Sequence, residues 1–255
     1  MIKKAKNIDI HLNFDMVSTR LSSYKGHSVF ALLLALMFFH NPLLIALTFI
    51  GANIPDFDHK FKKDHVYKLI ILGLIVFISL YILKLPYFVG LIIVFLGITF
   101  YFSEHRSFTH SIFGALVLTS AVSLIIIWSY ELVLGFTILD NSYLIIAVLI
   151  ALLSFLFLNK KLLLVFLPVF FLSLFFIKDV NFNYIEIVLA LFLGVFSHIV
   201  LDSFTPAGIK IFAPLSSKKV YKRFGLISIF ILVIFAIMYR LPILFKLFEQ
   251  YISMF

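Results

Sequence analysis

The chain has 255 residues, of which 63% are hydrophobic and only 13% are charged, a balance that excludes an ordinary soluble domain and indicates an integral membrane protein. It contains no cysteine, so disulfides, thiolate metal sites and cysteine nucleophiles are excluded. The formal net charge of +9 is typical of basic loops gathered on one membrane face, and nucleic-acid binding is not expected.

The apolar runs predict an all-α fold, a polytopic membrane helical bundle that forms a single domain over residues 1–255. A polar N-terminal tail, residues 1–25, precedes a short N-terminal helical hairpin predicted at 28–39 and 42–54. About seven further spans are predicted at 66–84, 86–103, 110–130, 142–158, 162–177, 184–202 and 225–248.

The first two helices are compatible with two topologies. Each is about 20 Å long at ~1.5 Å per residue, which is short of a hydrocarbon core of ~30 Å. A single kinked span would separate His27 from Asp56, whereas a hairpin turning at Asn41-Pro42 would return Asp56 to the side of His27. With the hairpin, 17 of the 21 Lys and Arg lie on the Asp56 side; with the single span, only 12 do. Because cytoplasmic loops carry the Lys/Arg excess, the hairpin is favoured and this side is expected to be cytoplasmic.

Polar clusters fall at the span ends on that side. His198 and Asp202 are four residues apart, so they share one helix face and can bind one metal ion or two adjacent ones. Asp56, Asp58 and His59 place two carboxylates and an imidazole within four residues, a donor set that Zn²⁺ or Mn²⁺ accepts. The alternatives are a His–Asp pair that caps a helix end and a solvated acidic loop.

A third cluster is the segment HRSFTHS, residues 105–111. His105 and His110 would be about 140° apart on an ideal helix, so we expect His105 in a loop and His110 in the first turn of the helix. Ser107 or Thr109 is expected as the N-cap. The helix N-terminus would favour an anion such as phosphate, to which Arg106 would add a bidentate donor; the alternative role for Arg106 is a topology anchor.

Four segments in order, residues 26–35 (GHSVFALLLA), 55–59 (PDFDH), 105–111 and 197–208 (SHIVLDSFTPAG), resemble the inner-membrane-associated metal-dependent hydrolases, some of which carry a LexA-binding label. That family is remotely similar to the zinc-dependent phospholipases C. The resemblance covers residues 26 to about 215, and relative to the compact form of the family it makes 142–177 an inserted helical pair. It implies metal ligands at His27, Asp56, His59, His105, His110, His198 and Asp202, with Asp58 as a further candidate, and substrate-side groups at Arg106, Thr109 and Thr205.

Together these features predict a membrane-bound metal-dependent hydrolase at the cytoplasmic face of the inner membrane, with two or more divalent ions, zinc or manganese. The preferred substrate is a phosphoester of a lipid or of a lipid-linked compound, and the expected partners are membrane lipids and that phosphorylated amphiphile. Asp58 or Asp56 would orient or deprotonate water. The alternatives are a non-catalytic scaffold with a structural metal, and a divalent-cation transporter, which would need polar groups near the bilayer midplane.

Overall fold

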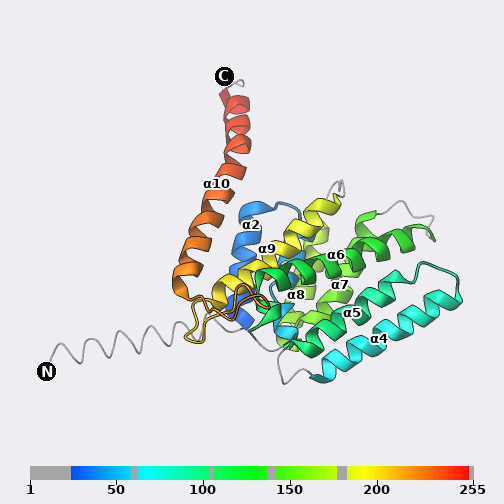
Figure 1. Cartoon of the computed structure of the whole chain (residues 1–255). Helices are drawn as coiled ribbons and strands as arrows, with labels where there is room; N and C mark the ends of the chain where they lie inside the picture. Colours follow the sequence, from blue (N-terminus) through cyan, green and yellow to red (C-terminus); the bar gives the residue numbers. More distant parts are fainter. Residues whose placement is uncertain (1–23, 59–62, 104–105, 137–141, 177–182, 253–255) are drawn as a thin grey trace.

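The computed structural model describes residues 24–58, 63–103, 106–136, 142–176 and 183–252. The α-helices of this part of the chain are α2 (Tyr24–Phe38), α3 (Pro42–Gly51), α4 (Lys63–Ile82), α5 (Phe88–Phe102), α6 (Ile112–Leu134), α7 (Ser142–Phe157), α8 (Lys160–Leu174), α9 (Tyr184–Asp202) and α10 (Lys222–Ile252) (Figure 1). The same described residues contain two 3₁₀ turns, η1 (Pro55–Asp58) and η3 (Phe108–His110). The fold is therefore all-helical, as the apolar runs predict.

The described residues do not show all of the expected spans. Within the part of the chain that the structure describes, four helices are long and apolar enough to cross a membrane, namely α4 from Asp64, α6, α9, and α10 as far as Pro242. The other three helices after the hairpin, α5, α7 and α8, have 15, 16 and 15 residues. Each is shorter than the ~20 residues that a full crossing requires, so about seven further spans are not seen.

The chain reverses between α2 and α3, which form the predicted hairpin (Figure 1). Asn41 is the N-cap of α3 and accepts a hydrogen bond from the backbone N–H of Leu43 at 2.9 Å, while Pro42 takes the first helical position, where no donor is needed. Arg240 of α10 donates from Nε to the carbonyl of Met37 at 2.7 Å and so satisfies a free carbonyl at the end of α2. The turn is thus held by both local and tertiary hydrogen bonds.

Helix α9 is the most buried of the four long helices, and α3 packs directly against it. Glycine makes this approach possible: a Cβ on Gly194 would lie 2.2 Å from the carbonyl oxygen of Thr48, and a Cβ on Gly51 would lie 2.8 Å from that of Leu191. The two backbones therefore touch. This contact carries the C-terminal end of α3, and the η1 turn that follows it, onto the last turns of α9.

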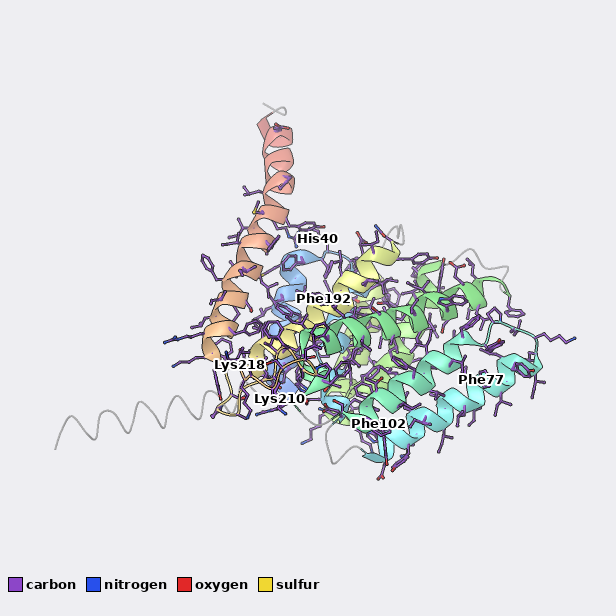
Figure 2. All side chains as sticks on the ribbon, in the orientation of Figure 1. His40, Phe77, Phe102, Phe192, Lys210 and Lys218 are labelled. Carbon is purple, nitrogen blue, oxygen red and sulfur yellow. The ribbon has the colours of Figure 1, made fainter. Side chains whose placement is uncertain are left out.

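Apolar side chains cover the outside of the bundle, as expected for a surface in contact with lipid. Ile71, Ile75 and Ile78 on α4 are all more than half exposed, and so is Phe102 at the end of α5. Figure 2 shows His40 at one end of the bundle and Lys210 and Lys218 at the other. The loop that follows α9 contains both Lys210 and Lys218, so the C-terminal end of α9 lies toward this lysine end.

Candidate metal centre

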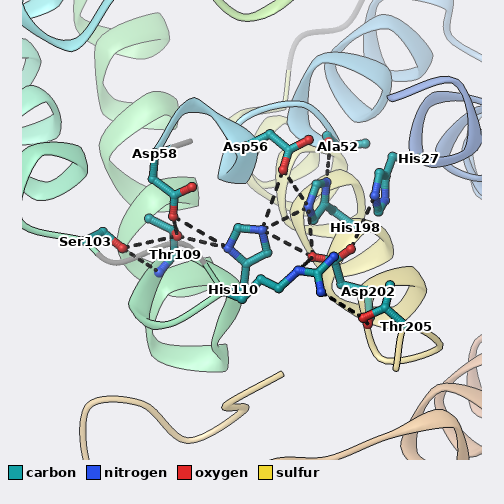
Figure 3. Close-up of polar contacts among 11 residues, drawn as sticks. His27, Ala52, Asp56, Asp58, Ser103, Thr109, His110, His198, Asp202 and Thr205 are labelled. Atoms are coloured by element: carbon teal, nitrogen blue, oxygen red, sulfur yellow. Dashed lines mark hydrogen bonds and ion pairs between the residues drawn. The ribbon is translucent and has the colours of Figure 1, made fainter. Parts of the chain in front are cut away.

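Imidazole and carboxylate groups from separate segments meet at this end of the bundle (Figure 3). The cluster consists of His27 in the first turn of α2, Asp56 in η1, His110 just before α6, and His198 and Asp202 in the last turns of α9. All but Asp56 are buried. The hairpin is what brings His27 and Asp56 to the same place, and the α3–α9 contact is what sets Asp56 beside His198.

His198 lies at the middle of the cluster. Its Nε2 atom is 3.2 Å from Nε2 of His110, 3.5 Å from Oδ1 of Asp56 and 3.6 Å from Oδ2 of Asp202. Asp202 faces two ways, with Oδ1 3.4 Å from Nε2 of His27 and Oδ2 3.3 Å from Nε2 of His110. Two groups of three residues have ligand atoms within 4.8 Å of one another, namely His27, His198 and Asp202, and Asp56, His110 and His198.

The hydrogen bonding of His198 shows why this arrangement suits a cation. Its Nδ1 lies 2.7 Å from the carbonyl oxygen of Ala52, which can only accept, so Nδ1 carries a proton and, when the ring is neutral, the lone pair is on Nε2. That lone pair points at another imidazole nitrogen and at two carboxylate oxygens. Acceptors that converge in a buried space repel one another unless a cation lies between them. The donor set, nitrogen and oxygen without sulfur, therefore fits a divalent metal ion such as zinc or manganese.

Asp56 is a carboxylate at neutral pH. Burial alone would raise its pKa, but the charge of His198 and a hydrogen bond with His110 outweigh burial and hold the pKa well below its ordinary value. Its side chain is 15% exposed. Asp56 is thus the member of the cluster that is both ionised and within reach of solvent.

Arg106 lies at the edge of the cluster. Its Nη1 donates to Oγ1 of Thr205 at 3.2 Å, and its Nε is 4.0 Å from Oδ2 of Asp202. Thr205 in turn donates to the backbone carbonyl of Asp202 at 2.8 Å. The Arg106 side chain is 28% exposed, so it stands between the buried acceptors and the solvent. An anion that approaches the cluster meets a guanidinium beside the imidazoles.

One family profile matches residues 23–253, nearly the whole chain, and it describes the YdjM inner membrane protein. The chain belongs to this family. The YdjM family comprises LexA-regulated, membrane-bound metal-dependent hydrolases, so the resemblance drawn from the ordered motifs is confirmed. No curated protein and no solved structure gives a match.

The local structure of the motif segments in this YdjM family member differs in part from the sequence-based prediction. The N-cap of α6 is Ser111, whose Oγ accepts a hydrogen bond from the backbone N–H of Gly114 at 3.0 Å. The prediction that Ser107 or Thr109 caps this helix is therefore wrong. His110 therefore lies just outside the helix. The backbone N–H of Ile112 donates to the carbonyl of Ile211 at 3.0 Å. Because these first-turn donors already have partners, the expected phosphate site at this helix N-terminus is not supported.

Asp58 and Thr109 flank the cluster instead of joining it. Oδ2 of Asp58 lies 3.7 Å from Nδ1 of His110, on the opposite side of the ring from the other ligand atoms, and accepts a hydrogen bond from the hydroxyl of Thr109. Such a carboxylate fixes the orientation of a ligating histidine and raises its basicity. His59 and His105, the other two expected ligands, lie outside the described residues.

We expect Asp58→Asn to weaken metal binding by about 10- to 100-fold, because the asparagine removes the negative charge that faces Nδ1 of His110. The measurement is a competition titration of the purified protein against a chelator of known affinity. Asp64→Asn, an exposed carboxyl at the start of α4, is the matched control and should leave the affinity unchanged. Equal affinities for the two variants would show that Asp58 does not support the centre.

Two contacts at the site carried little or no signal in the sequence. The carbonyl of Ala52 sets the tautomer of His198, but a backbone group is present at every residue and no residue type marks it. Asn53 donates from Nδ2 to Oγ of Ser28 at 3.2 Å and so ties the end of α3 to the start of α2, next to His27. The adjacency of Asn53 to the PDFDH motif, and of Ser28 to His27, is the only hint that could have led to this pair.

Proposed function

We propose that this protein is a membrane-bound metal-dependent hydrolase that cleaves a phosphoester of a lipid or of a lipid-linked compound at the cytoplasmic membrane face. The observation that carries the proposal is the convergence of three imidazoles and two carboxylates in a buried space whose rim holds a partly exposed arginine. Membership of a metal-dependent hydrolase family supports the same reading. The lysine-rich end at which the cluster lies supports the cytoplasmic side.

His27, Asp56, His110, His198 and Asp202 are the residues proposed to hold the metal. Zinc is the preferred ion and manganese the second choice, since both accept mixed imidazole and carboxylate ligands. A count of two or more ions is supported by Asp202, which presents one oxygen to His27 and the other to His110. A bound divalent cation would supply Lewis acidity, which polarises a phosphoryl oxygen and makes water a better nucleophile at neutral pH.

The protein's own residues would bind the phosphate, orient the metal ligands and position the attacking water. Arg106, steadied by Thr205, binds the phosphate oxygens at the open edge of the site. Asp58 and Thr109 hold His110 by Nδ1, so that Nε2 faces the cluster. Asp56, ionised and open to solvent, accepts a hydrogen bond from the attacking water and orients it toward the phosphorus, while the proton of that water passes to solvent and the departing alcohol takes a proton from solvent as the phosphorus–oxygen bond breaks.

The test is metal-dependent turnover by the detergent-purified protein, using phospholipids in mixed micelles and a soluble chromogenic phosphodiester. We expect chelation to abolish turnover and added zinc or manganese to restore it. Arg106→Lys should keep its metal yet lose about 10²- to 10³-fold in kcat/KM, because lysine cannot make the bidentate contact. Arg223→Lys, an exposed arginine at the start of α10, is the matched control and should be unaffected.

The scaffold alternative has one observation in its favour, which is the depth of burial of His110 and His198. A structural metal site is closed, whereas a catalytic site keeps a position open to substrate. The two functions separate in the same experiment. A metal-loaded protein that cleaves no phosphoester, and that unfolds when the metal is chelated, would contradict the hydrolase proposal and support the scaffold.

A further inference from the structure

A groove of about 890 Å³ lies between the hairpin helices α2 and α3 and helix α8. Its walls are almost entirely apolar, with Val29 and Leu32 from α2, Phe49 from α3, and Val165 and Phe166 from α8. Phe49 and Phe166, which both line it, stack on each other with ring centroids 5.3 Å apart. A volume of this size is in the range of ligand pockets.

The charged groups of the groove gather at one end. Lys25, in the first turn of α2, and Lys161, in the first turn of α8, both line it and are both exposed. The lining residues of α8 run from Lys161 to Ser173, which at ~1.5 Å per residue is a length of about 18 Å. This is close to one half of a ~30 Å hydrocarbon core. The groove thus has the length of one membrane leaflet and a positive mouth.

The positive mouth lies on the same side of the bundle as the metal centre. Ser28 lines the groove and directly follows His27, one of the clustered histidines. Near Lys161, Phe157 at the end of α7 packs edge-on against Phe57 with ring centroids 5.5 Å apart. Phe57 lies between Asp56 and Asp58 in η1. Both lysines are therefore next to elements that build the centre.

We propose that this groove binds an acyl chain of an anionic glycerophospholipid, with the lipid phosphate at Lys25 and Lys161, and that this class of lipid supplies the phosphoester for the metal centre. The second half of this inference rests on the proposed function. Apolar walls of leaflet length match an acyl chain, and two lysines at the mouth match a headgroup with a net negative charge better than a zwitterionic one, whose ammonium they would repel. The mouth beside His27 brings that phosphate to the edge of the centre.

Binding is tested by native mass spectrometry of the full-length protein with phosphatidylglycerol and phosphatidylcholine of identical chains. We expect the wild type to retain phosphatidylglycerol preferentially. The double variant Lys25→Ala/Lys161→Ala should bind it about 30-fold more weakly. Lys68→Ala/Lys218→Ala, which removes two exposed lysines elsewhere, should leave binding unchanged. Equal retention of the two lipids by the wild type, or no change in the first double variant, would overturn the inference.

A groove-filling substitution tests the acyl-chain half separately. Val165 is 66% exposed and lines the groove, so Val165→Trp should exclude the acyl chain with little effect on helix packing. Val148→Trp is the control, because Val148 is 57% exposed and lies on α7 outside the groove. We expect only Val165→Trp to lose the lipid and to raise KM for phosphatidylglycerol, without changing KM for a short soluble phosphodiester. Lipid turnover that Val165→Trp leaves unchanged would overturn the inference. Selective lipid binding without any turnover would instead contradict the proposed function and leave the groove site standing.

Discussion

We expect His198→Ala to remove all tightly bound metal, whereas His27→Ala and Asp56→Ala should each remove only part of it. His198 belongs to both groups of three ligands, while His27 and Asp56 each belong to one. Its Nδ1 atom already donates to the carbonyl of Ala52, so Nε2 is the nitrogen that it can offer to a metal ion. The affinity of the alanine variant should fall by well over ~100-fold, since loss of an outer partner alone costs 10- to 100-fold.

The measurement is the metal content of the detergent-purified protein by mass spectrometry, before and after titration with zinc or manganese. Asp202→Asn, which keeps the side-chain volume, is the second variant, and its thermal unfolding shows whether the fold survives. His40→Ala, at the opposite end of the bundle (Figure 2), should keep the wild-type metal content. Wild-type metal content in His198→Ala, or a wild type that takes up no metal on titration, would contradict the metal centre.

Much of this cluster follows from periodicity and from charge counting alone. His198 and Asp202 share a helix face because they are four residues apart, and the structure has both in the last turns of α9. The proximity of His27 to Asp56 required one further step, the hairpin, which the Lys/Arg distribution favoured and which the turn at Asn41-Pro42 makes. The first inference needs only the spacing of two nearby residues, and the second needs only a count of charges along the chain. Both can be read from a single sequence.

The two aspartates of the PDFDH motif show where the sequence stops being informative. As residue types they are equal candidates for ligand or base, and their spacing does not separate them. In the structure they lie two residues apart in a 3₁₀ turn, which has about three residues per turn, so their side chains point in different directions. Asp56 reaches His198, and Asp58 reaches Thr109 and His110. An extended segment, in which residues two apart lie on the same face, would have pointed both side chains the same way.

The start of α6 was missed for a related reason. Ser107, Thr109 and Ser111 are all good N-cap residues, and intrinsic preference hardly separates them. The choice is made by a segment about 100 residues away, where the carbonyl of Ile211 accepts from the backbone N–H of Ile112. Likewise the lengths of α5, α7 and α8 depend on the residues at which each helix ends and the chain turns. The apolar content of the sequence does not predict those residues. Long-range contacts override local preference at these points.

Gly194→Ala should impair the metal centre although it changes no ligand. The new Cβ would lie 2.2 Å from the carbonyl oxygen of Thr48 and 2.9 Å from the backbone nitrogen of Ala52, and backbone atoms cannot move aside as a flexible side chain does. Helices α3 and α9 must therefore separate, which lengthens the 2.7 Å contact between Ala52 and His198. The better helix propensity of alanine, about 1 kcal/mol, works in the opposite direction.

Overpacking of a close contact costs about 1–3 kcal/mol, so packing should outweigh propensity and the variant should unfold at a lower temperature in detergent. Metal affinity should fall by about 10- to 100-fold, as for loss of any group that orients a ligating histidine. Gly135→Ala is the matched control, because a Cβ there meets nothing closer than 3.5 Å. If Gly194→Ala bound metal like the wild type, the approach of α3 to α9 would not be what fixes His198. If affinity falls as expected, a helix-packing glycine sets the chemistry of the centre through one backbone carbonyl.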